Sequence, residues 1–202
     1  GFPKFKSKKN NHRSYTTNNQ NGTVAIENGY IKLPKLKSSV KIKQHRLFDG
    51  LIKSCTVSQT PSGNYFVSVL VECEIEKMPQ LETKVGIDVG IKTFAVMSNG
   101  KEIANPKHLR KSEKRLAKLQ KDLSRKVKGS KNRAKARLKV ARLHEKISNQ
   151  RLDFLHKTSF EIIRDNQAIV LEDLKVKNMV QNHKLAKAIS EVSWGMFRQL
   201  IE

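Results

Sequence analysis

Two acidic residues follow short apolar runs of the sequence. Asp88 comes after 85–87, and Glu172 comes after Ala168–Leu171. A carboxylate at the margin of a buried sheet loses hydration, which is costly unless it binds a cation, and carboxylate oxygens are the ligands that Mg²⁺ and Mn²⁺ prefer. If both runs are strands of one sheet, the acids could meet despite about 84 intervening positions. The pair therefore predicts a metal site for phosphoryl transfer, since paired ions stabilise the attacking and leaving oxygens.

Each acid by itself is a weak signal, and the order of the surrounding elements strengthens the pair. An Asp-x-Gly at 88–90 also occurs in actin-like and sugar-kinase phosphate loops, and an acid at a strand end can cap a helix or lie in an exposed turn. However, Thr93–Ser98 and Glu102–Ala104 predict a meander that begins with the strand of Asp88. A meander, a helical insertion and a fourth strand ending in Glu172 follow the order of a ribonuclease H-like fold.

A strongly basic insertion separates the two acids. The chain has 41 Lys and Arg against 18 Asp and Glu, and this net charge of +23 favours a polyanion such as nucleic acid as partner. Two apolar stripes around a break at 128–132 predict a helical hairpin over 106–165, with Asn105 as N-cap and Pro106 as first helical residue. Between Lys107 and Arg151, about 18 basic residues face three acids. A charge run usually marks a solvated face, but this imbalance favours phosphate contact.

The candidate nucleic-acid contacts lie at the chain start, just after Asp88 and along the hairpin. At the chain start, basic residues alternate with aromatic ones that could stack on bases, although a poorly ordered end fits equally well. Lys92 could meet a scissile phosphate or solvent, and Arg151 could meet nucleic acid or an acid of the core. The full set is Lys4, Lys6, Lys92, Arg110, Lys114, Lys118, Lys121, Arg125, Lys128, Lys131, Arg133, Arg137, Arg142 and Arg151, and it does not distinguish DNA from RNA.

Residues 1–80 are predicted to form a β-rich domain, followed by a second domain over 81–202. The Asn28-Gly29 dipeptide predicts a hairpin turn, and a second hairpin joins 52–59 to 64–74. Several short strands between turn signals predict a small barrel or sandwich. The segment 75–84 contains Met78-Pro79-Gln80 and indicates a linker between the two domains.

Membrane-spanning, secreted and thiolate-zinc classes do not fit the sequence. No stretch approaches the roughly 18 apolar residues of a membrane span, and no charged-then-apolar signal peptide opens it. The two cysteines, Cys55 and Cys73, form no CxxC pair, which excludes a disulfide framework and a four-thiolate zinc site within this chain. We therefore expect a cytoplasmic protein with reduced thiols.

Taken together, the motifs resemble the TnpB, or OrfB, family of bacterial insertion-sequence proteins, which are RuvC-like and related to type V CRISPR effectors. The resemblance is carried by Gly86–Lys92, by Asn149–Lys157, and by Ile169–Leu174 with Lys177-Asn178-Met179. Ser193-Trp194-Gly195 and the opening residues 1–6 extend it over nearly the whole chain. In combination these motifs are quite specific.

The resemblance implies an RNA-guided, metal-dependent DNA endonuclease of transposon type. It implies an α+β protein, with a wedge-like β-barrel domain over 1–80 and an incomplete RNase H-like (RuvC) domain over 81–202 that carries the hairpin at 106–165. Asp88 and Glu172 would be the first and second catalytic carboxylates and would hold Mg²⁺ or Mn²⁺. The implied partners are guide RNA and target DNA, with no membrane and no small-molecule cofactor, in the bacterial cytoplasm at the nucleoid.

The sequence departs from the family pattern in two respects. The third carboxylate, an Asp on a later strand, and the four-cysteine segment before it have no counterpart, so Zn²⁺ is expected only in a C-terminal segment outside this chain. Because both ends look cut, we expect a piece of a longer protein that is nearly inactive alone. The alternative is a non-catalytic basic RNA- or DNA-binding protein in which Asp88 and Glu172 are structural. An actin-like phosphotransferase is disfavoured, because the sequence has no further Gly-rich phosphate loop.

Overall fold

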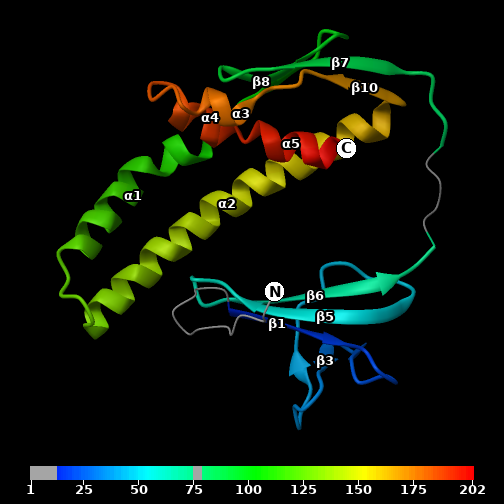
Figure 1. The fold of residues 1–202 in the computed structure, drawn as a ribbon, viewed down its shortest axis with the longest axis vertical. Helices are drawn as coiled ribbons and strands as arrows, with labels where there is room; N and C mark the ends of the chain where they lie inside the picture. The colour runs from blue at the N-terminus through cyan, green and yellow to red at the C-terminus, as the bar shows by residue number, and fades with distance from the viewer. Residues whose placement is uncertain (1–12, 75–78) are drawn as a thin grey trace, which may run out of the picture. The chain divides into compact units, whose positions relative to one another are not determined.

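The computed structural model describes residues 13–74 and 79–202, whose elements are shown in Figure 1. The chain divides into two compact units, Gly1–Lys77 and Met78–Glu202, and each has its own apolar core. The division falls inside the segment 75–84 that the sequence indicates as a linker. The predicted contacts Lys4 and Lys6 lie outside the described residues.

The first unit consists of two open antiparallel sheets. One sheet has the order β1-β5-β6 and the other the order β2-β3-β4. Their shared core is formed by Val24, Ile31, Leu33 and Cys55. The strands are β1 (Arg13–Asn18), β2 (Ala25–Glu27), β3 (Tyr30–Lys32), β4 (Val40–Lys41), β5 (Leu51–Gln59) and β6 (Tyr65–Glu72).

The predicted hairpins form, but the predicted barrel does not close within the described residues. Asn28 and Gly29 have φ values of 50° and 77°, the left-handed pair that a type I′ turn between β2 and β3 requires. The strands β2, β3 and β4 contain 3, 3 and 2 residues and pair only with one another among the described strands. They are too short to close the longer sheet into a barrel, so the unit remains two stacked open sheets.

The second unit contains a four-stranded mixed sheet of order β10-β7-β8-β9. β7 (Lys84–Val89), β8 (Thr93–Met97) and β9 (Glu102–Ala104) form the predicted antiparallel meander. β10 (Ala168–Leu171) returns after the helical insertion and pairs parallel with β7. A parallel pair needs a long crossover, and the two long helices supply it.

The crossover is a helical hairpin of α1 (His108–Ser124) and α2 (Lys131–Asp165), visible in Figure 1. At its tip Gly129 has a φ of 84°, and Ser130 Oγ accepts a hydrogen bond from the Arg133 N–H at 3.1 Å to cap α2. Leu116, Leu143 and Ile147 form the buried seam between the helices. Three short helices end the chain: α3 (Val176–Met179), α4 (Ala186–Val192) and α5 (Trp194–Ile201).

The start of α1 differs from the prediction. The helix begins two residues after Pro106, and Lys107, with a φ of 50°, takes the N-cap position. The Asn105 side chain instead accepts from the Lys107 N–H at 3.0 Å. The cap comes from α4, where Glu191 Oε1 accepts from the Arg110 N–H at 3.0 Å. A carboxylate is favourable there, because unsatisfied N–H groups and the helix dipole make a helix N-terminus positive.

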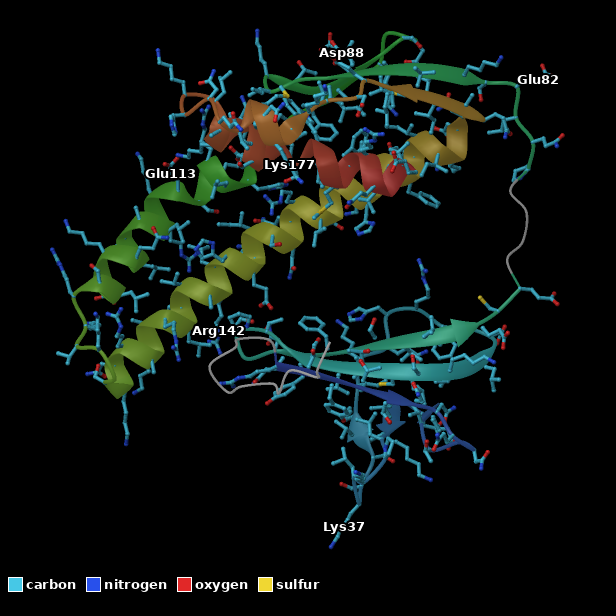
Figure 2. All side chains as sticks on the ribbon, viewed as in Figure 1. Lys37, Glu82, Asp88, Glu113, Arg142 and Lys177 are labelled. Atoms are coloured by element: carbon cyan, nitrogen blue, oxygen red, sulfur yellow. The ribbon has the colours of Figure 1, made fainter. Side chains whose placement is uncertain are left out.

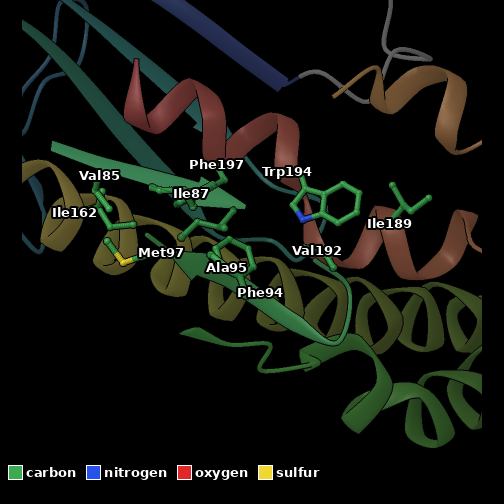
Figure 3. Close-up of a cluster of buried hydrophobic side chains, with 11 residues drawn as sticks. Val85, Ile87, Phe94, Ala95, Met97, Ile162, Ile189, Val192, Trp194 and Phe197 are labelled. Carbon is green, nitrogen blue, oxygen red and sulfur yellow. The ribbon is translucent and has the colours of Figure 1, made fainter. Parts of the chain in front are cut away.

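One face of the sheet lies against α2 and α5 and forms the main core of the second unit (Figure 3). The ring of Phe94 meets those of Phe154 and Phe197 edge-on, with ring centroids 4.9 Å apart in both pairs. Such pairs contribute about 0.5–1.5 kcal/mol each beyond the burial of their area. The other face of the sheet is open, and Val96 and Val170 on it are 39% and 68% exposed.

Candidate functional site

The register of the parallel pair brings the two predicted acids to the same edge of the sheet. Leu171, the last residue of β10, lies opposite Ile87 of β7; Glu172 directly follows β10, and Asp88 is the next residue of β7. Hydrogen-bonded strands are about 4.8 Å apart, so the two carboxylates leave neighbouring points of the backbone. The expectation that both acids share one sheet is therefore met by the strand pairing.

Both acids belong to the open face of the sheet. Val85 and Ile87 are buried in the core, so the alternation of a strand sends Asp88 to the other side. Figure 2 shows Asp88 on this strand, beside β10. The acids line a shallow, open hollow together with Gly86, Ile87, Val96, Met97, Ser98, Val170 and Leu171.

The carboxylates are exposed, which changes the reason for proposing a metal there. Asp88 and Glu172 are both solvent-exposed, and neither carboxylate has a hydrogen bond or an ion pair with a described residue. A desolvated carboxylate would need a cation, but these exposed carboxylates keep their hydration and do not. What remains is a pair of neighbouring, uncommitted carboxylates, which is a suitable but partial donor set for a hard divalent cation.

The other acids near this edge have partners of their own. Asp173 forms an ion pair with Arg198, whose Nε also lies 2.7 Å from Glu202 Oε1. The hydrogen bond that Arg198 donates to Glu202, followed by the one that it donates to Asp173, raises the pKa of the Arg198 guanidinium. Glu191 caps α1. Within residues 13–74 and 79–202, no three His, Cys, Asp or Glu side chains are grouped closely enough to hold a metal ion.

The glycine of the Asp-x-Gly motif, Gly90, is required by the backbone of the turn that follows β7. At Gly90 an added Cβ would lie 2.8 Å from the Thr93 carbonyl oxygen, so only glycine fits this turn between β7 and β8. The same turn is closed by a hydrogen bond from the Gly90 N–H to the Phe94 carbonyl at 3.0 Å. Lys92 lies in this turn with an exposed side chain. The motif thus fixes the end of the strand that carries Asp88.

Most of the predicted basic contacts on the hairpin are free to meet a partner. Exposed side chains are found at Arg110, Lys114, Lys118, Lys121, Arg125, Lys128, Lys131, Arg137 and Arg142. Only three acids lie between 107 and 151, and of these Asp122 pairs with Lys126 at 3.3 Å and Glu113 pairs with Lys187 of α4. The hairpin therefore presents a strongly positive surface.

Two of the predicted contacts have internal roles. Arg133 Nη1 donates to the carbonyls of Leu123 and Lys126, at 2.9 Å each, and so satisfies the C-terminal end of α1. Arg151 Nη1 donates to the Ser190 carbonyl of α4 at 3.3 Å. The sequence predicted Arg133 as a nucleic-acid contact and left Arg151 open between nucleic acid and an acid of the core, because spacing alone cannot show which cation donates to a backbone carbonyl.

Arg151 also belongs to a small cavity at the base of the hairpin. His108, Phe154 and Glu191 line it as well, and His108 Nε2 and Arg151 Nε are buried there without a hydrogen-bond partner among the described residues. Burial lowers the pKa of His108, and Lys111 lowers it further, against opposing effects of Glu191 and Asp153. His108 is therefore held in its neutral form to lower pH than an exposed histidine.

Sequence reasoning missed three basic residues that gather with Arg142. Arg115 of α1 and Lys139 and Lys146 of α2 line a groove between the two helices together with Arg142, Leu119 and Leu143. The signal was available, because 139, 142 and 146 follow the i, i+3, i+7 spacing of one helix face. Charge density along the chain, without this periodicity, does not single out these positions.

The fold and the site define an α+β protein, as expected, with two carboxylates on an open sheet edge and a basic helical hairpin between them in the sequence. Residues 66–183 match the family model OrfB_IS605, described as "Probable transposase". The whole chain is 43% identical to a Streptomyces pristinaespiralis protein named "Putative RNA-guided DNA endonuclease", of which it covers 50%. It is 37% identical over 88% of its length to the Escherichia coli K12 protein InsQ, which bears the same description, and covers 44% of it.

The chain therefore belongs to the TnpB/OrfB family, as the motifs indicated. It spans about half the length of the curated relatives it matches. Among the residues that the structure describes, no helix has the length and apolar character needed to cross a membrane.

Proposed function

We propose that this chain is part of an RNA-guided DNA endonuclease of transposon origin, and that Asp88 and Glu172 are two of its metal-binding carboxylates. The single observation that carries the proposal is the register of β7 and β10, which makes the two acids neighbours on one sheet edge. Two curated relatives with names of this activity support it. The sheet order β10-β7-β8-β9 supports the RNase H-like (RuvC) assignment of residues 81–202.

The two carboxylates suit Mg²⁺ or Mn²⁺ as cofactor, because both metals prefer oxygen ligands and open, partly hydrated sites. When bound, such ions stabilise the attacking and leaving oxygens of a phosphodiester. In this proposal Asp88 and Glu172 fix the position of the ions through rigid strands. Lys92, exposed in the turn after Asp88, would lie close enough to the edge to attract a phosphate.

A two-carboxylate edge is an incomplete donor set, so we propose that the 202-residue chain by itself cleaves little or no DNA. Among the residues lining the hollow at this edge, only Asp88 and Glu172 are acidic. The resemblance implies a further carboxylate on a later strand and a zinc segment, and neither is required for binding nucleic acid. Guide RNA and target DNA are the proposed partners, and the basic hairpin is their proposed attachment surface.

The test measures Mn²⁺ binding to the purified chain and DNA cleavage by the longer protein. Asp88→Asn or Glu172→Gln should weaken Mn²⁺ binding and reduce guided cleavage by at least about 100-fold, more than the about 10–100-fold effect of a residue that only orients a ligand. The matched control is Glu82→Gln. Glu82 is an exposed acid beyond the other end of β7, about 20 Å away at roughly 3.3 Å per strand residue.

The alternative is a basic nucleic-acid-binding protein in which these acids are structural. Under that alternative, Asp88→Asn and Glu172→Gln would leave both Mn²⁺ binding and cleavage equal to those of the Glu82→Gln control. Retained nucleic-acid binding in all three variants would then identify binding as the whole activity of this region.

A further inference from the structure

A groove runs between the two helices of the hairpin and carries cations on both rims. Arg115 lies on the α1 side, and Lys139, Arg142 and Lys146 lie on the α2 side. All four side chains are exposed. Below them, Leu119 is half-buried and Leu143 is only 6% exposed, so the floor of the groove is apolar.

The four cations have no partner among residues 13–74 and 79–202. No hydrogen bond or ion pair joins them to another residue in the described part of the chain, in contrast to Arg133 and Arg151. No acid lines the groove. Four like charges around an apolar floor repel one another, and this arrangement is favourable only when an anion occupies the space between them.

The spacing of the cations suits a repeating anion. Lys139, Arg142 and Lys146 occupy one stripe of α2, and at 1.5 Å per residue they span about 10 Å. One nucleic-acid strand advances about 3.4 Å per phosphate along its helix axis, so about three phosphates fit this stripe. Arg115 faces the same strand from the opposite rim, where its planar guanidinium can bind a phosphate through two hydrogen bonds.

We propose that this groove binds one sugar–phosphate strand of a nucleic acid, and that Arg115, Lys139, Arg142 and Lys146 are its anchoring contacts. The inference rests on the proposed function only in taking nucleic acid as the partner, and it does not depend on metal binding or cleavage. The remaining exposed cations of the hairpin supply a general attraction, whereas the groove fixes where the strand lies.

An acidic protein segment is the competing occupant. The regular spacing favours nucleic acid, because a polypeptide presents carboxylates irregularly, whereas each nucleotide presents one phosphate. Between 107 and 151, 18 Lys and Arg face three acids, and this excess of 15 positive charges suits a polyanion with one charge per unit.

The experiment compares two variants that lose the same charge. The groove variant carries Arg115→Gln, Lys139→Gln, Arg142→Gln and Lys146→Gln. The control variant carries Lys114→Gln, Lys121→Gln, Arg125→Gln and Arg137→Gln, which are exposed hairpin positions outside the groove lining. Binding affinity is measured at several salt concentrations for RNA and DNA oligonucleotides of the same sequence, each as a single strand and as a duplex. Polyglutamate is measured in the same way, as a probe for an acidic protein segment. Circular dichroism checks that both variants keep their helices.

The groove variant should bind at least about 100-fold more weakly at 0.1 M salt, and its log–log salt slope should fall by about 3 to 4. The control variant should lose less than about 10-fold, with a slope change of about 1. The ratio between the RNA and DNA arms identifies which strand the groove holds. A second measurement is amine acetylation, in which bound oligonucleotide should protect Lys139 and Lys146 more than Lys114 and Lys121.

The proposal would be overturned if the two variants lost the same affinity, or if bound oligonucleotide left the four lysines equally acetylated. The hairpin would then be a diffuse positive surface without a defined strand site. Tighter binding of polyglutamate than of every oligonucleotide, abolished in the groove variant, would assign the groove to an acidic protein instead. Glu82→Gln, at an exposed position that lines neither the groove nor the carboxylate edge, should keep wild-type affinity and salt slope. If the unmodified chain binds no oligonucleotide at all, the proposed partner fails as well, which separates that failure from a failure of the groove alone.

Discussion

The carboxylate edge and the basic hairpin lie in the same unit of the protein but are built by different means. At the edge, the backbone register of β7 and β10 fixes two side chains over a core that includes Phe94 and Phe197. On the hairpin, many cations sit on two helices that share only a thin seam. A site built on register depends on a few residues in an all-or-none way, whereas a charged surface changes in proportion to the number of cations removed.

The two regions should also differ in stability. The main core joins the sheet, α2 and the C-terminal helices, whereas the hairpin seam has Leu116, Leu143 and Ile147 as its buried members. Segments with few buried apolar contacts open locally at lower free energy than the core does. We therefore expect the hairpin tip to open first and the carboxylate edge to open only with the whole unit.

The largest effect should come from the core below the edge. Phe197→Ala should lower the free energy of unfolding by about 3–5 kcal/mol, because the Phe197 side chain is 1% exposed and packs edge-on against Phe94. Urea denaturation followed by tryptophan fluorescence measures it. The neighbouring Met196→Ala is the control, since Met196 is 38% exposed and should cost far less. Similar losses for both variants would contradict a core centred on these rings.

A smaller and more local effect should follow at the hairpin tip. Arg133→Ala should lower the local opening free energy of the last turn of α1 by about 1–2 kcal/mol, because it removes the guanidinium donor from the Lys126 carbonyl and leaves the Leu123 carbonyl with backbone donors alone. Hydrogen exchange of the amides in this turn measures it. Arg137→Ala, at an exposed position, should change exchange by less than about 0.5 kcal/mol. If Arg133→Ala also sped up amide hydrogen exchange in β7, the hairpin tip and the carboxylate edge would not open independently, contrary to our expectation.

The smallest effect should be a pH dependence at the junction of hairpin and core. Burial lowers the pKa of His108 in the folded state, so the unfolded state binds more protons as pH falls through about 6.5. Stability should therefore be full above that pH and fall below it. His108→Gln should make the decline between pH 7 and 5 shallower, whereas the exposed His144→Gln should not. An unchanged slope in His108→Gln would show that His108 does not couple folding to protons.

Short-range patterns predicted the local elements well. The Asn28-Gly29 turn, the meander of β7 to β9 and the Gly129 break between the helices were all visible as turn chemistry and periodicity. The N-terminus of α1 was predicted wrongly, because the residue that caps it, Glu191, lies 81 positions away from Arg110. Local propensity cannot identify a partner that tertiary folding supplies.

The sequence predicted which two acids lie together in the candidate site, because that depends only on the order of the strands. The apolar run before each acid, with the order of the elements, was sufficient to pair Asp88 with Glu172. It was not sufficient to give their exposure, because a four-residue apolar strand does not reveal which face of its sheet remains open. The cations of the groove were not predicted, for a related reason. Which of the many similar basic side chains lie together depends on how α1 packs against α2.

The parallel pairing of β7 and β10 also governs when the site can exist during synthesis. The meander can form as soon as residue 104 has left the ribosome, but β10 follows only after the entire hairpin. At roughly 5–20 residues per second, the interval between the synthesis of Asp88 and that of Glu172 is about 4 to 17 s. A pairing of such long sequence separation is slow to form, because loop closure must precede it. The hairpin, which ends at Asp165, is synthesised within that interval, so its positive charge is in place before Glu172 can join Asp88 at the sheet edge, and nucleic acid can bind before the two acids meet.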